Sequence, residues 1–200
     1  MRFKFAVLLA GAFLFLTVPA FAGPISFCAS GSYGPTDVGT SVMSGGLTAT
    51  GWMGTSTTTQ NTPTDLSCKD EGAAEFGLGI FADPTHDGEI GVGDFVQVAG
   101  LTGATITVIE SVQSGEGFEL FGSDTNGVLG TDLLGSGSGC GTCTATFNMG
   151  SNTYLDLTAS KGNVLLDNVA TPEPSTYLLM GTGLLMLGFL MRRKLASASV

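Results

Sequence analysis

Hydrophobic and polar positions alternate over short runs along residues 23–170, and glycine, asparagine, aspartate and serine separate these runs. Alternation with a period of two is typical of strands that bury one face. No stretch of this region keeps a helical period over ten residues. We therefore expect eight to eleven strands, of which the clearest lie at residues 76–80, 95–98, 105–108, 117–120, 144–147, 154–157 and 163–169.

The turns between these runs favour antiparallel pairing. Residues 40–42 and 47–50 flank Gly45-Gly46, a pair that suits a two-residue hairpin turn. Many short strands with regular turn signals are typical of a single antiparallel β-sandwich, here expected to be jelly-roll-like. Residues 23–170 are the predicted ectodomain, because about 150 residues form one domain. The polar run Thr55–Thr64 is expected to be a loop or an irregular edge.

The N-terminal end has the three-part layout of a secretory signal. Arg2 and Lys4 precede an apolar run at residues 5–18, and Ala20-Phe21-Ala22 supplies small residues for cleavage. We predict a signal peptide over residues 1–22 that signal peptidase removes. The alternative is an N-terminal membrane anchor, for which the apolar run is short.

The C-terminal end combines an apolar segment with a basic cluster. Residues 177–191 carry no charge and are followed by Arg192, Arg193 and Lys194. The pattern predicts one short transmembrane helix over residues 176–191, with the basic cluster on the cytoplasmic side as a stop-transfer signal. The alternative is a buried core helix. It is disfavoured because a polar, glycine-rich β domain offers no place for a helix that is apolar all round.

Pro172-Glu173-Pro174 stands directly before this helix, and its two prolines favour an extended segment that a processing enzyme can bind. Together with the apolar helix and the basic cluster, it resembles the PEP-CTERM sorting signal of Gram-negative bacteria. The same tail is also labelled an ice-binding protein C-terminal motif. The resemblance implies a sorting signal over residues 171–200, cleavage by an exosortase, and a path from the inner membrane to the cell surface or extracellular matrix.

Charge narrows the range of partners. The chain has 17 acidic residues against 7 Lys and Arg, with a formal net charge of −10. Sixteen acids and two lysines lie between residues 23 and 172, a balance of −14 in the exported part. Nucleic acid is excluded as an expected partner, because its binding rests on Lys and Arg that neutralise phosphates. Anionic polymers would need bridging divalent cations.

One acidic loop suggests a calcium site. Asp83, Asp87 and Glu89 lie close together among glycines, and calcium takes six to eight oxygen ligands from such loops. Their spacing differs from that of an EF-hand. A solvated acidic turn is the alternative, and these three residues are the first to test for calcium.

Four cysteines in an exported chain predict disulfides. Cys28, Cys68, Cys140 and Cys143 allow three connectivities, of which one closes Cys140 on Cys143 and joins Cys28 to Cys68. A redox role for the close pair is the alternative. It is disfavoured because a reactive pair needs a helix N-terminus, whereas residues 144–147 are predicted to form a strand.

We expect no catalytic activity. His86 is the only histidine, and the sequence has no nucleophile elbow, phosphate-binding loop or paired-histidine metal motif. Trp52, the only tryptophan, is expected in the core, with a sugar contact as the alternative. The predicted function is a binding or structural role in the exopolysaccharide or biofilm layer. A calcium-dependent glycan-binding module is the main alternative; an ice-binding protein or a secreted glycan-active enzyme is less favoured.

Overall fold

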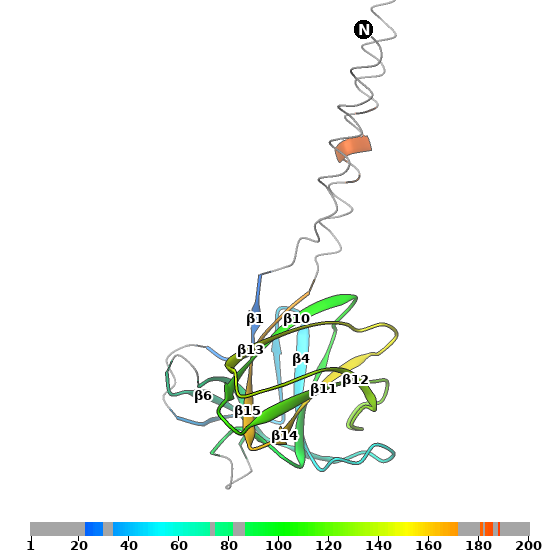
Figure 1. Cartoon of the computed structure of the whole chain (residues 1–200). Helices are drawn as coiled ribbons and strands as arrows, with labels where there is room; N and C mark the ends of the chain where they lie inside the picture. The colour runs from blue at the N-terminus through cyan, green and yellow to red at the C-terminus, as the bar shows by residue number, and fades with distance from the viewer. Residues whose placement is uncertain are drawn as a thin grey trace, which may run out of the picture. The chain divides into compact units, whose positions relative to one another are not determined.

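The structure, a computed structural model, describes residues 23–29, 34–72, 75–81 and 87–171, together with residues 181, 183–185 and 188. All of its strands belong to one compact unit, Gly23–Thr171. Its strands form two antiparallel sheets, so the predicted all-β class is confirmed (Figure 1).

The first sheet has the strand order β13-β10-β15-β7-β6-β2, and two short strands, β1 and β8, also pair with β15. Its strands are β13 (Gly141–Asn148), β10 (Ala104–Val112), β15 (Asn163–Ala170), β7 (Phe76–Ile80), β6 (Leu66–Asp70), β2 (Thr36–Gly39), β1 (Ile25–Ser26) and β8 (Ile90–Gly91).

The second sheet has the order β12-β11-β14-β9-β4-β3, and β5 pairs with β4 beside β3. Its strands are β12 (Asp132–Ser138), β11 (Gly117–Ser123), β14 (Tyr154–Lys161), β9 (Asp94–Ala99), β4 (Leu47–Met53), β3 (Ser41–Ser44) and β5 (Thr62–Thr64).

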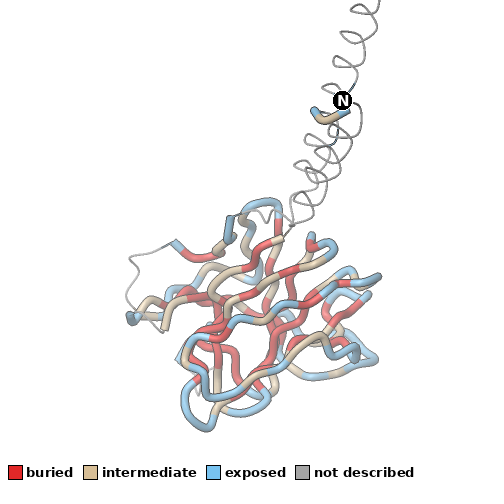
Figure 2. The backbone as a smooth tube through the Cα atoms, turned by 45° about the horizontal axis from the view of Figure 1, so that its top comes forward, coloured by how far each residue is buried: buried red, intermediate tan, exposed pale blue. Residues whose placement is uncertain are grey.

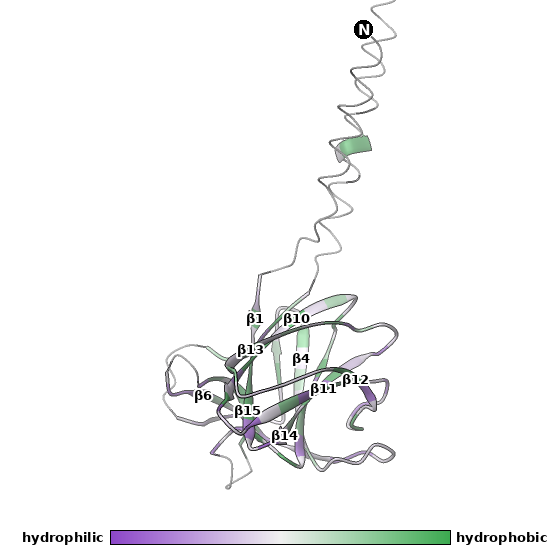
Figure 3. Ribbon diagram, viewed as in Figure 1, coloured by the Kyte–Doolittle hydropathy of each residue, from purple (hydrophilic) through white to green (hydrophobic). Residues whose placement is uncertain are grey.

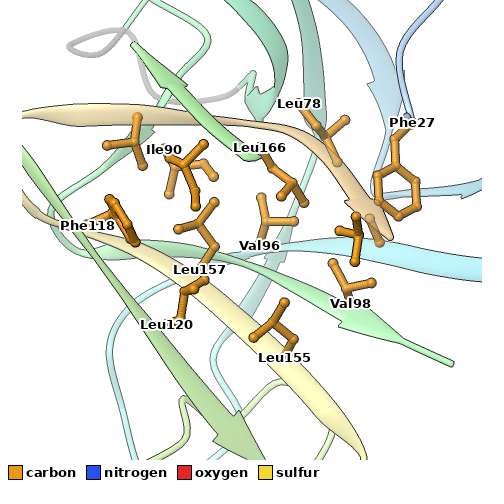
Figure 4. Packing of buried hydrophobic residues seen from close by; sticks show 14 of the residues in the cluster. Phe27, Leu78, Ile90, Val96, Val98, Phe118, Leu120, Leu155, Leu157 and Leu166 are labelled. Carbon is orange, nitrogen blue, oxygen red and sulfur yellow. The ribbon is translucent and has the colours of Figure 1, made fainter. Parts of the chain in front are cut away.

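One hydrophobic core takes side chains from both sheets. Leu78 and Leu166 come from the first sheet, and Val96, Leu155 and Leu157 come from the second; all are buried in the same cluster (Figure 4). Several strands, among them β6, β9 and β14, are buried over most of their length, and the loops are mostly exposed (Figure 2). Hydrophobic positions, in green, lie along several of the strands (Figure 3). Burial of these apolar faces is the main favourable term for the fold.

Every run named in the sequence as a clear strand lies within a strand of the structure. The expected hairpin is also present: β3 pairs with β4 in antiparallel register, and Ser44 faces Leu47 across the turn. Gly45 and Gly46 have φ values of +56° and +83°, a backbone that residues with a side chain rarely adopt. The run Thr55–Thr64 is irregular except for β5 at its end.

The predictions for the two chain ends fall largely outside the described residues. The signal peptide over residues 1–22, Pro172-Glu173-Pro174 and the basic cluster at 192–194 are among them. Residues 181, 183–185 and 188 of the predicted helix 176–191 are described and have α-helical backbone. Within the part of the chain that the structure describes, no helix has the length and apolar character needed to cross a membrane.

Candidate functional site

Lys69 on β6 is almost fully buried, with 4% of its surface exposed, and carboxylates surround its ammonium group. Its Nζ lies 3.0 Å from Glu89 Oε1, 3.3 Å from Glu71 Oε2, 3.5 Å from Asp87 Oδ2 and 3.6 Å from Glu75 Oε2. Lysine is seldom buried unless it is paired. Glu89 is its buried partner, whereas the other three acids reach it from the exposed rim.

Glu89 has 2% of its surface exposed and accepts hydrogen bonds at both carboxylate oxygens. Oε1 accepts from Lys69 Nζ and from Ser111 Oγ at 2.9 Å, and Oε2 accepts from Asn163 Nδ2. Ser111 has a φ of +59° where β10 changes register against β13. We call this group, with the three rim acids, the Lys69 cluster: Lys69, Glu71, Glu75, Asp87, Glu89, Ser111 and Asn163.

Glycine allows Glu89 to approach the first sheet closely. A Cβ at Gly79 on β7 would overlap the carbonyl oxygen of Gly88 and the Cα of Glu89. Asp87 and Gly88 have φ values of +49° and +78°, so the chain turns sharply before it enters β8. A larger residue at position 79 would therefore displace Glu89 from Lys69.

Burial and the neighbouring opposite charge shift the pKa in opposite directions, both for Lys69 and for Glu89. Burial alone lowers the pKa of Lys69, but the hydrogen bonds and charges of Glu89 and Glu71 outweigh it and raise that pKa. Burial raises the pKa of Glu89 more than the hydrogen bonds from Lys69 and Ser111 lower it. The ammonium is therefore held charged, while the Glu89 carboxylate accepts a proton more readily than an exposed one.

Two of the three predicted calcium ligands, Asp87 and Glu89, belong to the Lys69 cluster, and Asp83 lies outside the described residues. The Lys69 ammonium already contacts both carboxylates, so it competes with any cation for the same oxygens. Among residues 23–29, 34–72, 75–81 and 87–171, no group of three or more His, Cys, Asp and Glu is arranged to hold a metal ion. Calcium at Asp83, Asp87 and Glu89 stays a prediction.

The cysteines pair in one of the three connectivities that the sequence allows. Cys28 is joined to Cys68, and Cys140 to Cys143. The first bond joins the segment after β1 to β6, next to Lys69, across 40 residues of sequence. The second closes the start of β13 on itself, and no helix begins there to lower a thiol pKa. Both positions fit a structural role.

Trp52 on β4 is buried, with 2% of its surface exposed. Its ring stacks on Phe95 at a centroid distance of 6.4 Å, and the two pack with Leu129 and Phe121 in a second, smaller cluster. A Cβ at Gly127 would contact the Trp52 ring, so the loop around Gly127 lies directly against it. Trp52 therefore packs in the core, as expected from the sequence, and a sugar would have to displace that loop to reach the ring.

A shallow groove of about 390 Å³ lies between β12 and β13, which are edge strands of the two sheets. Its lining is rich in glycine and in small hydroxyl side chains, with the buried ring of Phe118 among them. We call it the β12–β13 groove; the residues used below are Gly135, Ser136, Gly137, Thr142, Thr144 and Thr146. An adjoining pocket of about 320 Å³ includes Ser138 and the chain's second ectodomain lysine, Lys161. Hydroxyl and backbone groups of this kind hydrogen-bond to polar, uncharged ligands.

The sequence match at the C-terminal end identifies how the protein is handled by the cell. Residues 170–194 match the family described as the PEP-CTERM protein-sorting motif. The chain carries a PEP-CTERM sorting signal. Its match begins at Ala170, the last residue of β15, so in the sequence the signal directly follows the last strand. No curated protein and no solved structure matches the chain.

The PEP-CTERM signal confirms the resemblance seen in the sequence. It indicates an exported protein of a Gram-negative bacterium that is held at the membrane by its sorting signal and processed by an exosortase. Exosortase is therefore the processing partner of this chain.

Asp87 and Glu89 stand out in the sequence of this PEP-CTERM protein, whereas the residues that contact them do not. Lys69 stands in the run Leu66–Asp70, which does not alternate because four of its five residues are buried. Asn163 reaches Glu89 because Val164 of β15 pairs with Ile90, next to Glu89, a contact between residues distant in sequence. The one available signal is that Lys69 is one of only two lysines in a strongly acidic region.

Proposed function

We propose that this PEP-CTERM protein is a non-catalytic component of the exopolysaccharide or biofilm layer, with a jelly-roll-like β-sandwich ectodomain that binds matrix polysaccharide. The observation that carries the proposal is the sorting signal at residues 170–194, directly after the last strand of a compact unit. Signal peptidase releases the N-terminal end, and exosortase then delivers the ectodomain to the cell surface or matrix.

The β12–β13 groove is the proposed contact surface for the polysaccharide. Thr142, Thr144 and Thr146 are exposed and occupy alternate positions along β13, so their hydroxyls lie on one side of the strand. Ser136 adds a further hydroxyl from β12. Acids outnumber lysines by sixteen to two in the exported region, so the groove suits a neutral polysaccharide.

A calcium-dependent glycan-binding module is the second candidate. Asp87 keeps 72% of its side chain exposed and contacts Lys69 at the edge of the cluster. Such an exposed carboxylate beside further acids can share a cation with an anionic sugar. This candidate predicts that EDTA abolishes polysaccharide binding, whereas groove binding of a neutral polysaccharide persists without calcium.

The test is co-sedimentation of the processed protein with exopolysaccharide prepared from a bacterium that encodes an exosortase. Pelleting is measured in calcium and then in EDTA. We expect the protein to pellet in both buffers. Pelleting in calcium alone supports the second candidate instead, and no pelleting in either buffer contradicts matrix binding by the ectodomain.

Two variants locate the surface. Ser136→Gln combined with Thr144→Gln fills the groove with uncharged atoms and is expected to abolish pelleting. Met43→Gln changes an exposed residue, 74% accessible, on β3 at the other side of the second sheet, and is expected to pellet like the wild type. Equal pelleting of all three proteins would contradict the assignment of the groove.

A further inference from the structure

The Glu89 carboxylate bridges a lysine and an asparagine inside the domain. Lys69 Nζ donates to Oε1 over 3.0 Å, and Asn163 Nδ2 donates to Oε2 of the same group. The amine and the amide therefore both contact the same carboxylate, one at each oxygen. Lys69 and Glu89 are both more than nine-tenths buried, and Asn163 is partly buried.

This arrangement contains the three groups that an intramolecular transamidation needs. A lysine amine is the nucleophile, a carboxamide is the electrophile, and a carboxyl group within hydrogen-bond distance of both carries the proton. Holding two reactants in one folded molecule replaces a bimolecular encounter with an intramolecular step, which in well-oriented cases corresponds to an effective molarity of about 10⁵–10⁸ M.

We propose that Lys69 and Asn163 form an intramolecular isopeptide bond, with Glu89 as the group that transfers the proton. The inference does not depend on the matrix-binding proposal, because it concerns only the covalent structure of the folded unit.

Each atom in the reaction is accounted for. Lys69 Nζ gives one proton to Glu89 Oε1, and the neutral amine attacks the Cγ of Asn163. The new N–C bond forms as the Cγ–Nδ2 bond breaks. The leaving nitrogen takes the bonding electron pair, the proton from Glu89 and the second proton that Nζ loses, and it departs as an ammonium ion, so the neutral mass of the protein falls by one ammonia. No oxidant, reductant or metal is consumed, and the Glu89 carboxylate is regenerated.

The slow step is the formation of the neutral amine. The carboxylates around Lys69 raise its pKa, so the neutral amine is a minor population. Burial also raises the pKa of Glu89, and this helps the Glu89 carboxylate to accept the proton. Departure of the ammonium ion makes the reaction irreversible in dilute solution. A minor population therefore suffices, provided that the protein remains folded for long enough.

The proposed bond would transmit a pulling force on the C-terminal end of the domain to other strands of the first sheet. It joins β6 to β15, two strands that both pair with β7 between them. β15 ends at Ala170, where the sorting signal begins. Cys68, next to Lys69, is already bonded to Cys28 near the start of the folded unit. Covalent links would then run from the strand that leads to the sorting signal, through β6, to the N-terminal segment.

The experiment is an intact mass measurement on the purified protein with its termini determined and both disulfides reduced. We expect a mass lower than that of its sequence by one ammonia. Trypsin should leave Lys69 uncleaved and joined to the peptide that follows Lys161, which contains Asn163. Full sequence mass after prolonged incubation of the folded protein, or a loss of water in place of ammonia, overturns the proposal.

Conservative variants separate the cross-link from other losses of ammonia. Lys69→Arg keeps the positive charge but removes the nucleophile, and Glu89→Gln keeps the shape but removes the proton carrier. Both are expected to have full sequence mass, whereas Lys161→Arg, a change at the other lysine, should still lose ammonia. Ammonia loss that persists in Lys69→Arg points to cyclisation at an asparagine and overturns the proposal.

Discussion

Gln97 on β9 and Asp156 on β14 are joined inside the second sheet by a hydrogen bond of 2.8 Å from Gln97 Nε2 to Asp156 Oδ1. Both residues are buried. Their remaining oxygens accept from backbone: Gly130 N donates to Asp156 Oδ2 at 2.7 Å, and Gly127 N donates to Gln97 Oε1 at 2.8 Å. The pair therefore holds the loop that contains Gly127 and Gly130, which covers Trp52, against the second sheet by hydrogen bonds.

This pair predicts that the domain becomes less stable as the pH rises. Burial raises the pKa of Asp156 to about 7, although the hydrogen bonds from Gln97 and Gly130 favour the carboxylate. The folded state thus binds more protons than the unfolded state above the ordinary aspartate pKa, and the free energy of unfolding falls as the pH rises toward 7. Urea denaturation should give a value higher at pH 5 than at pH 8 by about 2–3 kcal/mol from this residue.

Asp156→Asn tests the assignment of that slope. The variant cannot ionise, so the difference between pH 5 and pH 8 should shrink, whatever the variant's absolute stability. Part of the slope should remain, because burial also raises the pKa of Glu89, Glu110 and Asp167. An unchanged slope would assign the pH dependence to those other carboxyls.

Removing the cation from the Lys69 cluster should be costly. Lys69→Met leaves the buried Glu89 without its opposite charge, and breaking a buried pair costs about 3–5 kcal/mol. Lowering the pH should restore part of that loss, because protonation removes the uncompensated charge of Glu89. Urea denaturation of Lys69→Met and of Lys161→Met measures the effect, and the second variant, at an exposed lysine, should lose less than about 0.5 kcal/mol.

The two disulfides should contribute unequally to stability. Loss of the Cys28–Cys68 bond frees a loop of 40 residues, for which chain entropy predicts about 4 kcal/mol, while the Cys140–Cys143 loop predicts about 2 kcal/mol. The double variants Cys28→Ala with Cys68→Ala, and Cys140→Ala with Cys143→Ala, can be compared by thermal and urea denaturation. A larger loss in the second variant would mean that loop entropy does not govern their contributions.

Trp52 should report on packing and not on ligand binding. Its buried ring is expected to give fluorescence that acrylamide quenches poorly and that exopolysaccharide leaves unchanged. Trp52→Ala should lose about 3–5 kcal/mol of unfolding free energy through the cavity it leaves. Where that variant still folds, it should pellet with exopolysaccharide. Loss of pelleting in a folded Trp52→Ala protein would restore Trp52 as a sugar contact.

Local pattern was sufficient to predict much of the fold. Phe76–Ile80 alternates and forms β7, and Gly45-Gly46 makes the turn that its sequence favours. The strand β12 was not predicted, because its glycines and serines resemble a loop and its residues are mostly exposed or half-buried. β6 was missed for the opposite reason, since burial on both faces removes alternation.

The candidate site depends on contacts that local pattern cannot supply. Asp87 and Glu89 stand out as acids in the sequence. The hydrogen-bond partners of Glu89, however, are Lys69, 20 residues away, and Asn163, 74 residues away. Those pairings follow from sheet order, which the sequence did not determine. The sorting signal was predictable because its parts are contiguous in the sequence. The processing enzyme is expected to bind it as an extended segment, so recognising it needs no knowledge of the fold.

Exosortase is expected to deliver this protein from the membrane to the matrix. The most direct measurement is the C-terminal residue and the location of the protein in matched cells with and without their exosortase. With the enzyme, we expect a protein shortened near Pro172-Glu173-Pro174 and recovered in the matrix or at the cell surface. Without it, the full-length protein should remain in the membrane fraction. An identical C-terminus and location in both strains would contradict delivery by exosortase.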